Sequence, residues 1–207
     1  MAFVADAVKG IGMKRVRVLV ALCAMLFSAA PVMAQQIVSE IRAGVMAHDA
    51  YPLWLPWNVP LINANQIEDV SFDILFTSPD VAVFDWLGSP KPNFGATFNL
   101  DGQENMAHLA LTWQKNVLDG PVFVEASLGA AVHDGILKGR LNGPNTNGGK
   151  LRPQGCRVQI YTGLGIGMML TENVTATLSY EHMSNMRMCS PNYGLSNLGL
   201  KLGWKFD

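Results

Sequence analysis

The chain has 207 residues, of which 49% are hydrophobic and only 15% are charged, and its formal net charge is −1. This length fits a single domain with an ordinary core. Beyond residue 34 the chain has no block of basic residues, so we do not expect it to bind nucleic acid. So many hydrophobic residues belong either in a buried core or on the outside of a membrane β-barrel.

Residues 1–34 have the pattern of a secretion signal. Three basic residues precede an apolar run at 18–27, and a small-x-Ala cleavage site follows at 32–34. The run is much shorter than the roughly 20 residues of a membrane-spanning helix, which argues against a retained single-span anchor. We therefore expect a signal peptide at 1–34 and a β-barrel domain at 35–207.

Eight later segments alternate between apolar and polar residues with a period of two. Successive side chains of a β-strand point to opposite faces, so each segment is predicted to be a strand with one apolar and one polar face. In chain order the predicted strands are 37–48, 69–76, 93–100, 105–114, 122–134, 157–170, 173–184 and 196–206.

Eight such segments are typical of an outer-membrane barrel, whose apolar side chains face lipid and whose polar side chains face the lumen. A soluble lipocalin-like barrel would have the reverse polarity, and the period alone does not exclude it. However, the polar faces carry charged residues that are costly in a dry core. Tyr180 and Trp204 also lie near opposite ends of the apolar stripes, as girdle residues would. We predict an all-β fold, an eight-stranded antiparallel transmembrane β-barrel.

The connections between the predicted strands differ in length. Barrels of this kind have longer outer loops and shorter periplasmic turns. The predicted turn at 77–92 is too long for this rule, and the predicted loop at 49–68 is apolar enough to lie on the bilayer or fold over a neighbour. The predicted outer loops are 49–68, 101–104, 135–156 and 186–195, and the predicted turns are 77–92, 115–121 and 171–173.

Two cysteines, Cys156 and Cys189, lie beyond the signal. In an exported chain an even pair favours a disulfide over a metal site. Antiparallel pairing across the tight turn at 172–173 also brings Cys156 opposite about Cys189, so we predict a disulfide, with two free thiols as the alternative. The four histidines have no metal-ligand spacing, and we expect neither a metal nor another cofactor.

His182 and Ser184 lie at the end of an apolar stripe, on the same face of one predicted strand. The histidine can therefore take the proton of the serine, with His182 as general base, Ser184 as nucleophile and Asn185 as a donor to the oxyanion. Closing the last hairpin places Ser196 opposite about Ser184 and one diagonal step from His182. The alternative is that these are polar residues at headgroup depth, because a catalytic triad is recognised by geometry rather than by a triplet.

The sequence His-Met-Ser-Asn at 182–185, followed by Pro-Asn-Tyr-Gly at 191–194 and a closing strand at 200–206, resembles the outer-membrane lipid A 3-O-deacylase family. The resemblance is loose over the rest of the chain. It implies an eight-stranded barrel with a Ser, His and acidic triad on its lipid-facing wall, which removes the 3-position acyl chain of lipid A. The implied partners are lipid A or lipopolysaccharide and the bacterial outer membrane, and a homodimer stays open.

By this resemblance Ser184 is the nucleophile, His182 the base and Asn185 an oxyanion contributor, but the position of the family's acid holds Ser196. Losing the acid of a triad can cost about 10⁴ in rate. Either Ser196 orients His182 by a hydrogen bond, or another acid substitutes, or catalysis is lost and the barrel kept. Glu181 is the nearest acid but is predicted to face the lumen. We expect an esterase, with a non-catalytic barrel as the alternative.

Overall fold

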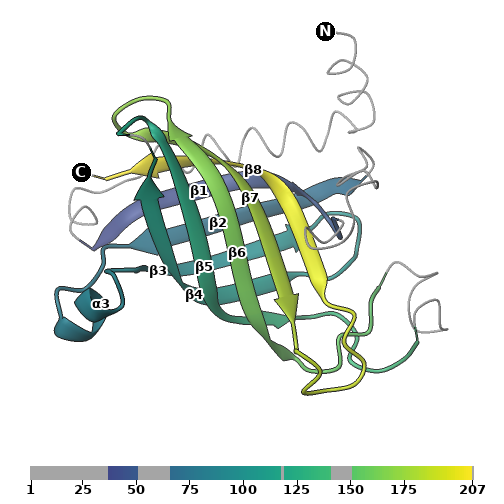
Figure 1. Ribbon diagram of the computed structural model, residues 1–207. Coiled ribbons are helices and arrows are strands. Elements are labelled where there is room, and N and C mark those ends of the chain that lie inside the picture. The colour runs from purple at the N-terminus through teal and green to yellow at the C-terminus, as the bar shows by residue number, and fades with distance from the viewer. Residues whose placement is uncertain (1–36, 51–65, 118, 141–150, 207) are drawn as a thin grey trace, which may run out of the picture.

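The structure is a computed structural model that describes residues 37–50, 66–117, 119–140 and 151–206. Eight antiparallel strands form a closed barrel in which each strand pairs with its neighbours in the sequence and the last pairs with the first (Figure 1). The prediction of an all-β, eight-stranded antiparallel barrel is therefore confirmed. The expected signal peptide at 1–34 lies outside the described residues.

The strand bounds agree with the alternating segments of the sequence to within two residues at every end, because this periodicity is a local property of each strand. One short helix, α3, spans Ala82–Trp86. The strands are β1 (Val38–Ala47), β2 (Ile67–Phe76), β3 (Lys91–Asn99), β4 (Met106–Asn116), β5 (Val122–His133), β6 (Val158–Met169), β7 (Val174–Ser184) and β8 (Leu195–Lys205).

Apolar side chains lie on the outer wall, whereas the lumen holds many polar side chains together with a buried apolar cluster that includes Met106, Tyr161 and Met183. On β6, for example, Val158, Leu164 and Ile166 are each more than half exposed, whereas the charged Arg42 on β1 is 2% exposed. This polarity is the reverse of that of a soluble lipocalin-like barrel, so that alternative is wrong. None of the described helices is long and apolar enough to cross a membrane.

Arg42 shows how the lumen is neutralised. Its guanidinium lies 3.0 Å from a carboxylate oxygen of Glu40 and 2.8 Å from one of Glu125. Gly165 on β6 leaves the necessary space, since a Cβ at this position would lie only 2.6 Å from Cγ of Glu125. The small inward residues of β6 therefore make room for a paired network of charges, as an eight-stranded barrel requires.

The end of the barrel where β7 ends and β8 begins is called the loop end here, and the opposite end is called the turn end. Figure 1 shows α3 and the C-terminus at the turn end. The connection after β2 is long because it contains α3, and Trp113 of β4 holds it by donating Nε1–H to the carbonyl oxygen of Leu87 at 2.7 Å. The helix therefore explains why the predicted turn at 77–92 is longer than the short periplasmic turns of other barrels.

Candidate active site

His182 and Ser184 lie on the outer face of β7 at the loop end, as their parity predicts. The strand pairing places His182 directly opposite Ser196 of β8, and it places Ser184 opposite Ile160 of β6. The prediction that Ser196 faces Ser184 is therefore wrong by two residues. The reason is that β8 begins at Leu195, which pairs with Met183, so that the pairing of this hairpin ends before it reaches Ser184.

A short chain of hydrogen bonds runs across the outer wall from β7 to β8. His182 Nδ1 lies 2.8 Å from Ser196 Oγ, and the Tyr180 hydroxyl donates to the same oxygen at 2.9 Å. If Nδ1 carries the proton and donates it to Ser196, Nε2 is the basic atom of the imidazole. Tyr180 is only 4% exposed, so it does not present its ring to lipid as the predicted girdle residue would.

A cleft of about 280 Å³ opens over His182 and Ser184. The backbone of Gly194 forms part of its wall: a Cβ at this residue would lie 3.1 Å from Cε1 of His182 and 3.6 Å from Cβ of Ser184. Gly194 also has φ +65°, a conformation that favours glycine. The structure thus brings the predicted base, nucleophile and Ser196 to one cleft, which is lined by Asp49, Arg152, His182, Ser184, Asn192, Tyr193, Gly194 and Ser196.

An apolar groove of about 390 Å³ lies on the same outer wall. Tyr180 and Leu198 line it, and they form the next outward-facing pair after His182 and Ser196 in the ladder between β7 and β8. The groove therefore begins beside the cleft and continues towards the middle of the wall. Its lining residues are Val124, Glu125, Leu164, Gly165, Ile166, Leu178, Tyr180 and Leu198.

The lipid A 3-O-deacylase (PagL) family matches residues 71–205, which run from β2 to β8. The chain belongs to this family. Among solved structures it is similar to the crystal structure of the outer membrane enzyme PagL, with 13% identity over 80% of this chain and 99% of that one and a TM-score of 0.50. This structural likeness shows the fold. No curated protein matches the chain.

Two other solved barrels are similar to this chain. The N-terminal β-barrel domain of Pseudomonas aeruginosa OprF has 13% identity, covers 83% of this chain and 100% of that one, and has a TM-score of 0.49. Neisserial surface protein A has 10% identity, with 83% and 97% covered and a TM-score of 0.44. The predicted resemblance to the lipid A 3-O-deacylase family is confirmed by the family match, and the protein is an outer-membrane barrel of the PagL family.

Asn185 follows Ser184, the predicted nucleophile, but points into the protein, where it is fully buried. Its side-chain amide donates to the carbonyl oxygens of Gln154 at 2.7 Å and Pro191 at 2.9 Å, and its backbone N–H donates to Asn192 Oδ1 at 2.9 Å. These bonds fix the connection between β7 and β8. The predicted oxyanion role of Asn185 would require one of these donors to leave its present acceptor.

Cys156 and Cys189 form the predicted disulfide, with their Cα atoms 5.7 Å apart. The bond joins the segment before β6 to the connection after β7, so both walls of the cleft that come from these segments are tied together. The hydrogen bond from Gln154 Nε2 to the carbonyl oxygen of Gly194, at 3.2 Å, links the same two segments. The disulfide is therefore a brace of the cleft.

Removing the disulfide should loosen the connection after β7 without opening the barrel. We expect trypsin to cleave after the exposed Arg187 at least about tenfold faster in the Cys156→Ser/Cys189→Ser variant, because a disulfide typically contributes 2–4 kcal/mol against opening of the loop that it closes. Cleavage is followed by mass spectrometry of the folded protein in detergent. Reductant should accelerate cleavage of the native protein but not of this variant, and equal cleavage rates for both proteins would contradict the brace.

Asp49 and Arg152 line the cleft, and the sequence did not indicate either of them. They lie outside the alternating segments, on connections whose fold depends on contacts across the loop end. Their side chains form an ion pair with each other. Burial raises the pKa of the Asp49 carboxyl to about 6, although the neighbouring Arg152 acts in the opposite direction. The only sequence signal was that Asp49 follows a predicted strand directly.

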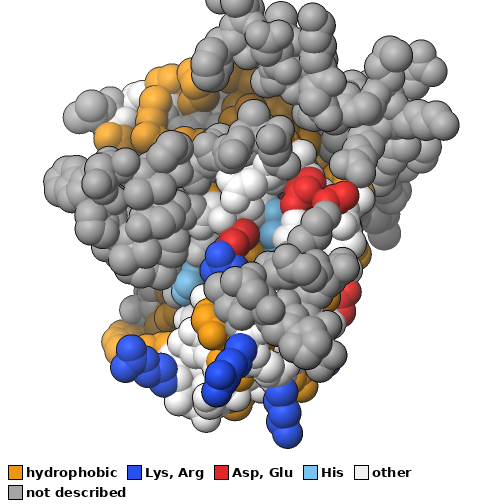
Figure 2. Space-filling view, turned by 90° about the vertical axis from the view of Figure 1, so that its right-hand side faces the viewer, with side chains coloured by type: hydrophobic (Ala, Val, Ile, Leu, Met, Phe, Trp, Pro, Cys, Tyr) orange, Lys and Arg blue, Asp and Glu red, His pale blue; other side chains and the backbone are white. Residues whose placement is uncertain are grey.

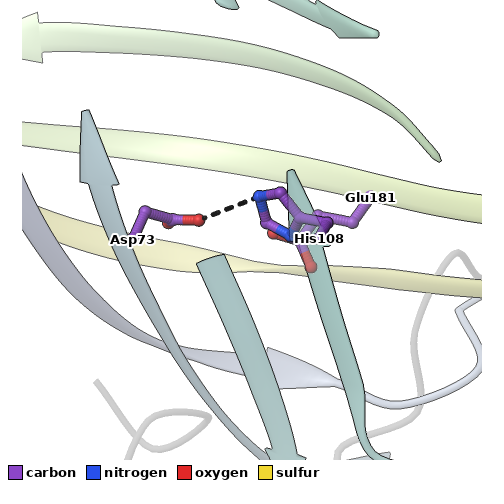
Figure 3. A group of neighbouring side chains, drawn as sticks. All are labelled: Asp73, His108 and Glu181. Carbon is purple, nitrogen blue, oxygen red and sulfur yellow. Dashed lines mark ion pairs between the residues drawn. The ribbon is translucent and has the colours of Figure 1, made fainter. Parts of the chain in front are cut away.

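Glu181 faces the lumen, as its parity predicts, and does not support His182. Its carboxylate belongs to a cluster with Asp73 and His108, whose geometry could hold a metal ion (Figure 3). However, Lys201 Nζ lies 2.5 Å from Asp73 Oδ2 and 2.6 Å from Glu181 Oε1. The lysine ammonium thus supplies positive charge to these carboxylates, and we interpret the cluster as an ion-pair network that fills the lumen.

Proposed function

We propose that the protein hydrolyses the 3-O-linked acyl ester of lipid A, with Ser184 as nucleophile and His182 as general base. The observation that carries the proposal is the hydrogen bond of 2.8 Å between His182 Nδ1 and Ser196 Oγ on the outer wall, with Ser184 lining the same cleft. Membership of the PagL family and the apolar groove beside the cleft agree with a substrate whose acyl chains lie in the bilayer.

In this mechanism His182 takes the proton of Ser184 while Ser184 Oγ attacks the carbonyl carbon of the ester. The tetrahedral intermediate then breaks its bond to the sugar oxygen at position 3, which receives the proton from His182 and leaves as an alcohol. The acyl chain is now bound to Ser184. Water, activated by the same histidine, releases it as a fatty acid and restores the serine. The apolar groove would hold the acyl chain while both steps occur.

Ser196 supplies orientation instead of negative charge. A serine cannot stabilise an imidazolium by charge, so this site should be slower than a site with a carboxylate in this position. Ser196 Oγ nevertheless accepts hydrogen bonds well, and Tyr180 fixes it from the other side at 2.9 Å. We therefore assign Ser196 and Tyr180 as positioning residues that hold the His182 ring, with Nε2 as the nitrogen that would take the proton of the nucleophile.

The proposal is tested with the purified full-length protein and lipopolysaccharide in detergent. Lipid A is extracted after incubation and examined by mass spectrometry. We expect the loss of one acyl chain from lipid A and the appearance of the corresponding fatty acid. If lipid A keeps its mass across a range of detergents and divalent-cation concentrations, the non-catalytic barrel of the same family is the correct alternative.

The positioning role predicts how two substitutions combine. Tyr180→Phe removes one hydrogen bond and should lower kcat about three- to tenfold, because such a bond contributes about 1 kcal/mol. Ser196→Glu restores a carboxylate beside His182 and should raise kcat above the native value. In the Ser196→Glu background, Tyr180→Phe should have little further effect, since the carboxylate orients the ring by itself.

These variants are compared by initial rates on lipopolysaccharide at saturating substrate. Ser196→Ala serves as a second test, because it removes the hydroxyl without adding bulk, and it should lower kcat at least as much as Tyr180→Phe. If Ser196→Ala and Tyr180→Phe both retain the native rate, neither residue positions the base, and another group must do so.

A further inference from the structure

Two charged side chains line the cleft beside the proposed nucleophile. Arg152 and Asp49 form an ion pair there, and their side chains are 35% and 26% exposed. Figure 2 looks onto the loop end and shows charged and histidine side chains gathered near the middle of this face. The Arg152 guanidinium lines the same cleft as Ser184 and is partly exposed there.

A buried network holds the backbone of Arg152 in place. Its N–H donates to Glu104 Oε1 at 2.5 Å, and Glu104 is 2% exposed. The other carboxylate oxygen of Glu104 lies 3.5 Å from His48 Nε2, while His48 Nδ1 lies 2.9 Å from Asp69 Oδ2. Gly135 leaves space for this arrangement, because a Cβ there would lie 2.2 Å from Cγ of Glu104. The backbone of Arg152 is thus fixed by buried contacts of the folded barrel.

The ion pair between Asp49 and Arg152 is weak enough for a ligand to replace it. Ion pairs between partly exposed side chains contribute little to stability, since solvent screens them. The Asp49 carboxyl has its pKa raised to about 6 by burial, so its charged form is not strongly favoured in this cleft. A phosphate group, in contrast, can form two parallel charge-assisted hydrogen bonds with one guanidinium. A phosphorylated ligand can therefore replace Asp49 on Arg152.

On the basis of the deacylase function proposed above, we propose that Arg152 binds a phosphate group of the lipid A disaccharide while the 3-O ester lies over Ser184. Lipid A is a phosphorylated glucosamine disaccharide, so the anion and the ester belong to one molecule. The phosphate contact fixes the sugar at the edge of the bilayer, and the apolar groove receives the acyl chain. Arg152 is then a specificity-determining residue that selects the phosphorylated form of the substrate.

The test measures binding rather than turnover, so that it remains informative if the deacylase function fails. All proteins carry Ser184→Ala, which leaves the lipid intact, and are titrated in mixed micelles with phosphorylated lipid A and with enzymatically dephosphorylated lipid A. Arg152→Gln should weaken binding of the phosphorylated lipid at least about tenfold. Binding of the dephosphorylated lipid should change less than about twofold.

Arg140→Gln is the matched control, because it removes the same charge from an exposed position on the same connection, outside the cleft. It should leave both affinities within about twofold of the reference protein. Arg152→Lys should restore part of the preference for phosphate, since it keeps the charge but not the planar fork.

Three results would overturn the proposal. One is an Arg152→Gln variant that binds both lipids as well as the reference protein does. Another is an equal loss on both lipids, which would mean that Arg152 only shapes the cleft. The third is a loss of affinity for the phosphorylated lipid in Arg140→Gln that equals the loss in Arg152→Gln. It would mean that any positive charge at this end of the barrel attracts the phosphate. Inorganic phosphate is added as a competitor: displacement of the lipid at equal concentration would show a site for free phosphate, and the absence of displacement supports the lipid headgroup.

Discussion

Replacing Ser184 by alanine should abolish removal of the acyl chain from lipid A. We expect kcat to fall by about 10³ to 10⁴ or more, because in the proposed mechanism this side chain supplies the atom that forms the acyl intermediate. The substitution removes one oxygen from a half-buried outward position, so the barrel should stay intact. The rate is measured by mass spectrometry of lipid A. Ser190→Ala makes the same change at an exposed serine of the next connection and should keep the native rate.

His182→Ala should lower kcat by a similar factor. The double variant Ser184→Ala/His182→Ala should be no slower than either single variant. Groups that act as one unit are strongly non-additive, because the nucleophile without its base is already nearly inactive. Independent, multiplying losses in the double variant would show that the two residues do not act together. Native rates in both single variants would place the chemistry elsewhere on the barrel, or leave a protein without catalysis.

The second large effect is expected in the lumen and concerns stability instead of rate. Lys201→Met should destabilise the barrel by about 3–5 kcal/mol, because it leaves two buried carboxylates without their counter-charge. The ammonium of Lys201 lies within 2.6 Å of an oxygen of Asp73 and an oxygen of Glu181. Unfolding in urea, with the protein reconstituted in lipid vesicles, provides the free energy for comparison with the native chain.

Two controls separate lost charge from lost packing. Lys205→Met removes a lysine from the turn-end edge of the same strand and should change the stability by less than about 1 kcal/mol. Adding Asp73→Asn and Glu181→Gln to Lys201→Met removes the uncompensated charges and should recover most of the loss. If the triple variant is no more stable than Lys201→Met, ion pairing is not what Lys201 contributes.

The barrel could be predicted well from the sequence, because each strand has its own alternation of apolar and polar residues. The alternation of residues along β7 is enough to place His182 and Ser184 outside and Glu181 inside. The tight turn at 172–173 fixed the pairing of β6 with β7 closely enough to predict that Cys156 lies near Cys189. The partner of Ser196 was predicted wrongly, since a hairpin register depends on how many residues the connection takes up. Parity is fixed by single residues, whereas register is fixed by the whole loop.

The rest of the cleft could not be predicted because it depends on contacts between distant segments. Asp49 follows the first strand and Arg152 precedes the sixth, and nothing in their neighbourhoods marks them as partners. Tyr180 was interpreted as a girdle residue because its position on the apolar stripe was visible and its bond to Ser196 was not. Irregular connections have no repeating pattern of apolar and polar residues, so the contacts between them can be found only from the three-dimensional structure.

Closure of the barrel has a consequence for when the proposed active site can form. The N–H of Ala50, next to Asp49, donates to the carbonyl oxygen of Ser196 at 2.6 Å, and β1 pairs with β8 along the same seam. The cleft is therefore complete only after β1 has paired with β8. A folding intermediate whose first and last strands have not yet paired lacks part of this cleft, so under the function proposed above it should not cleave lipid.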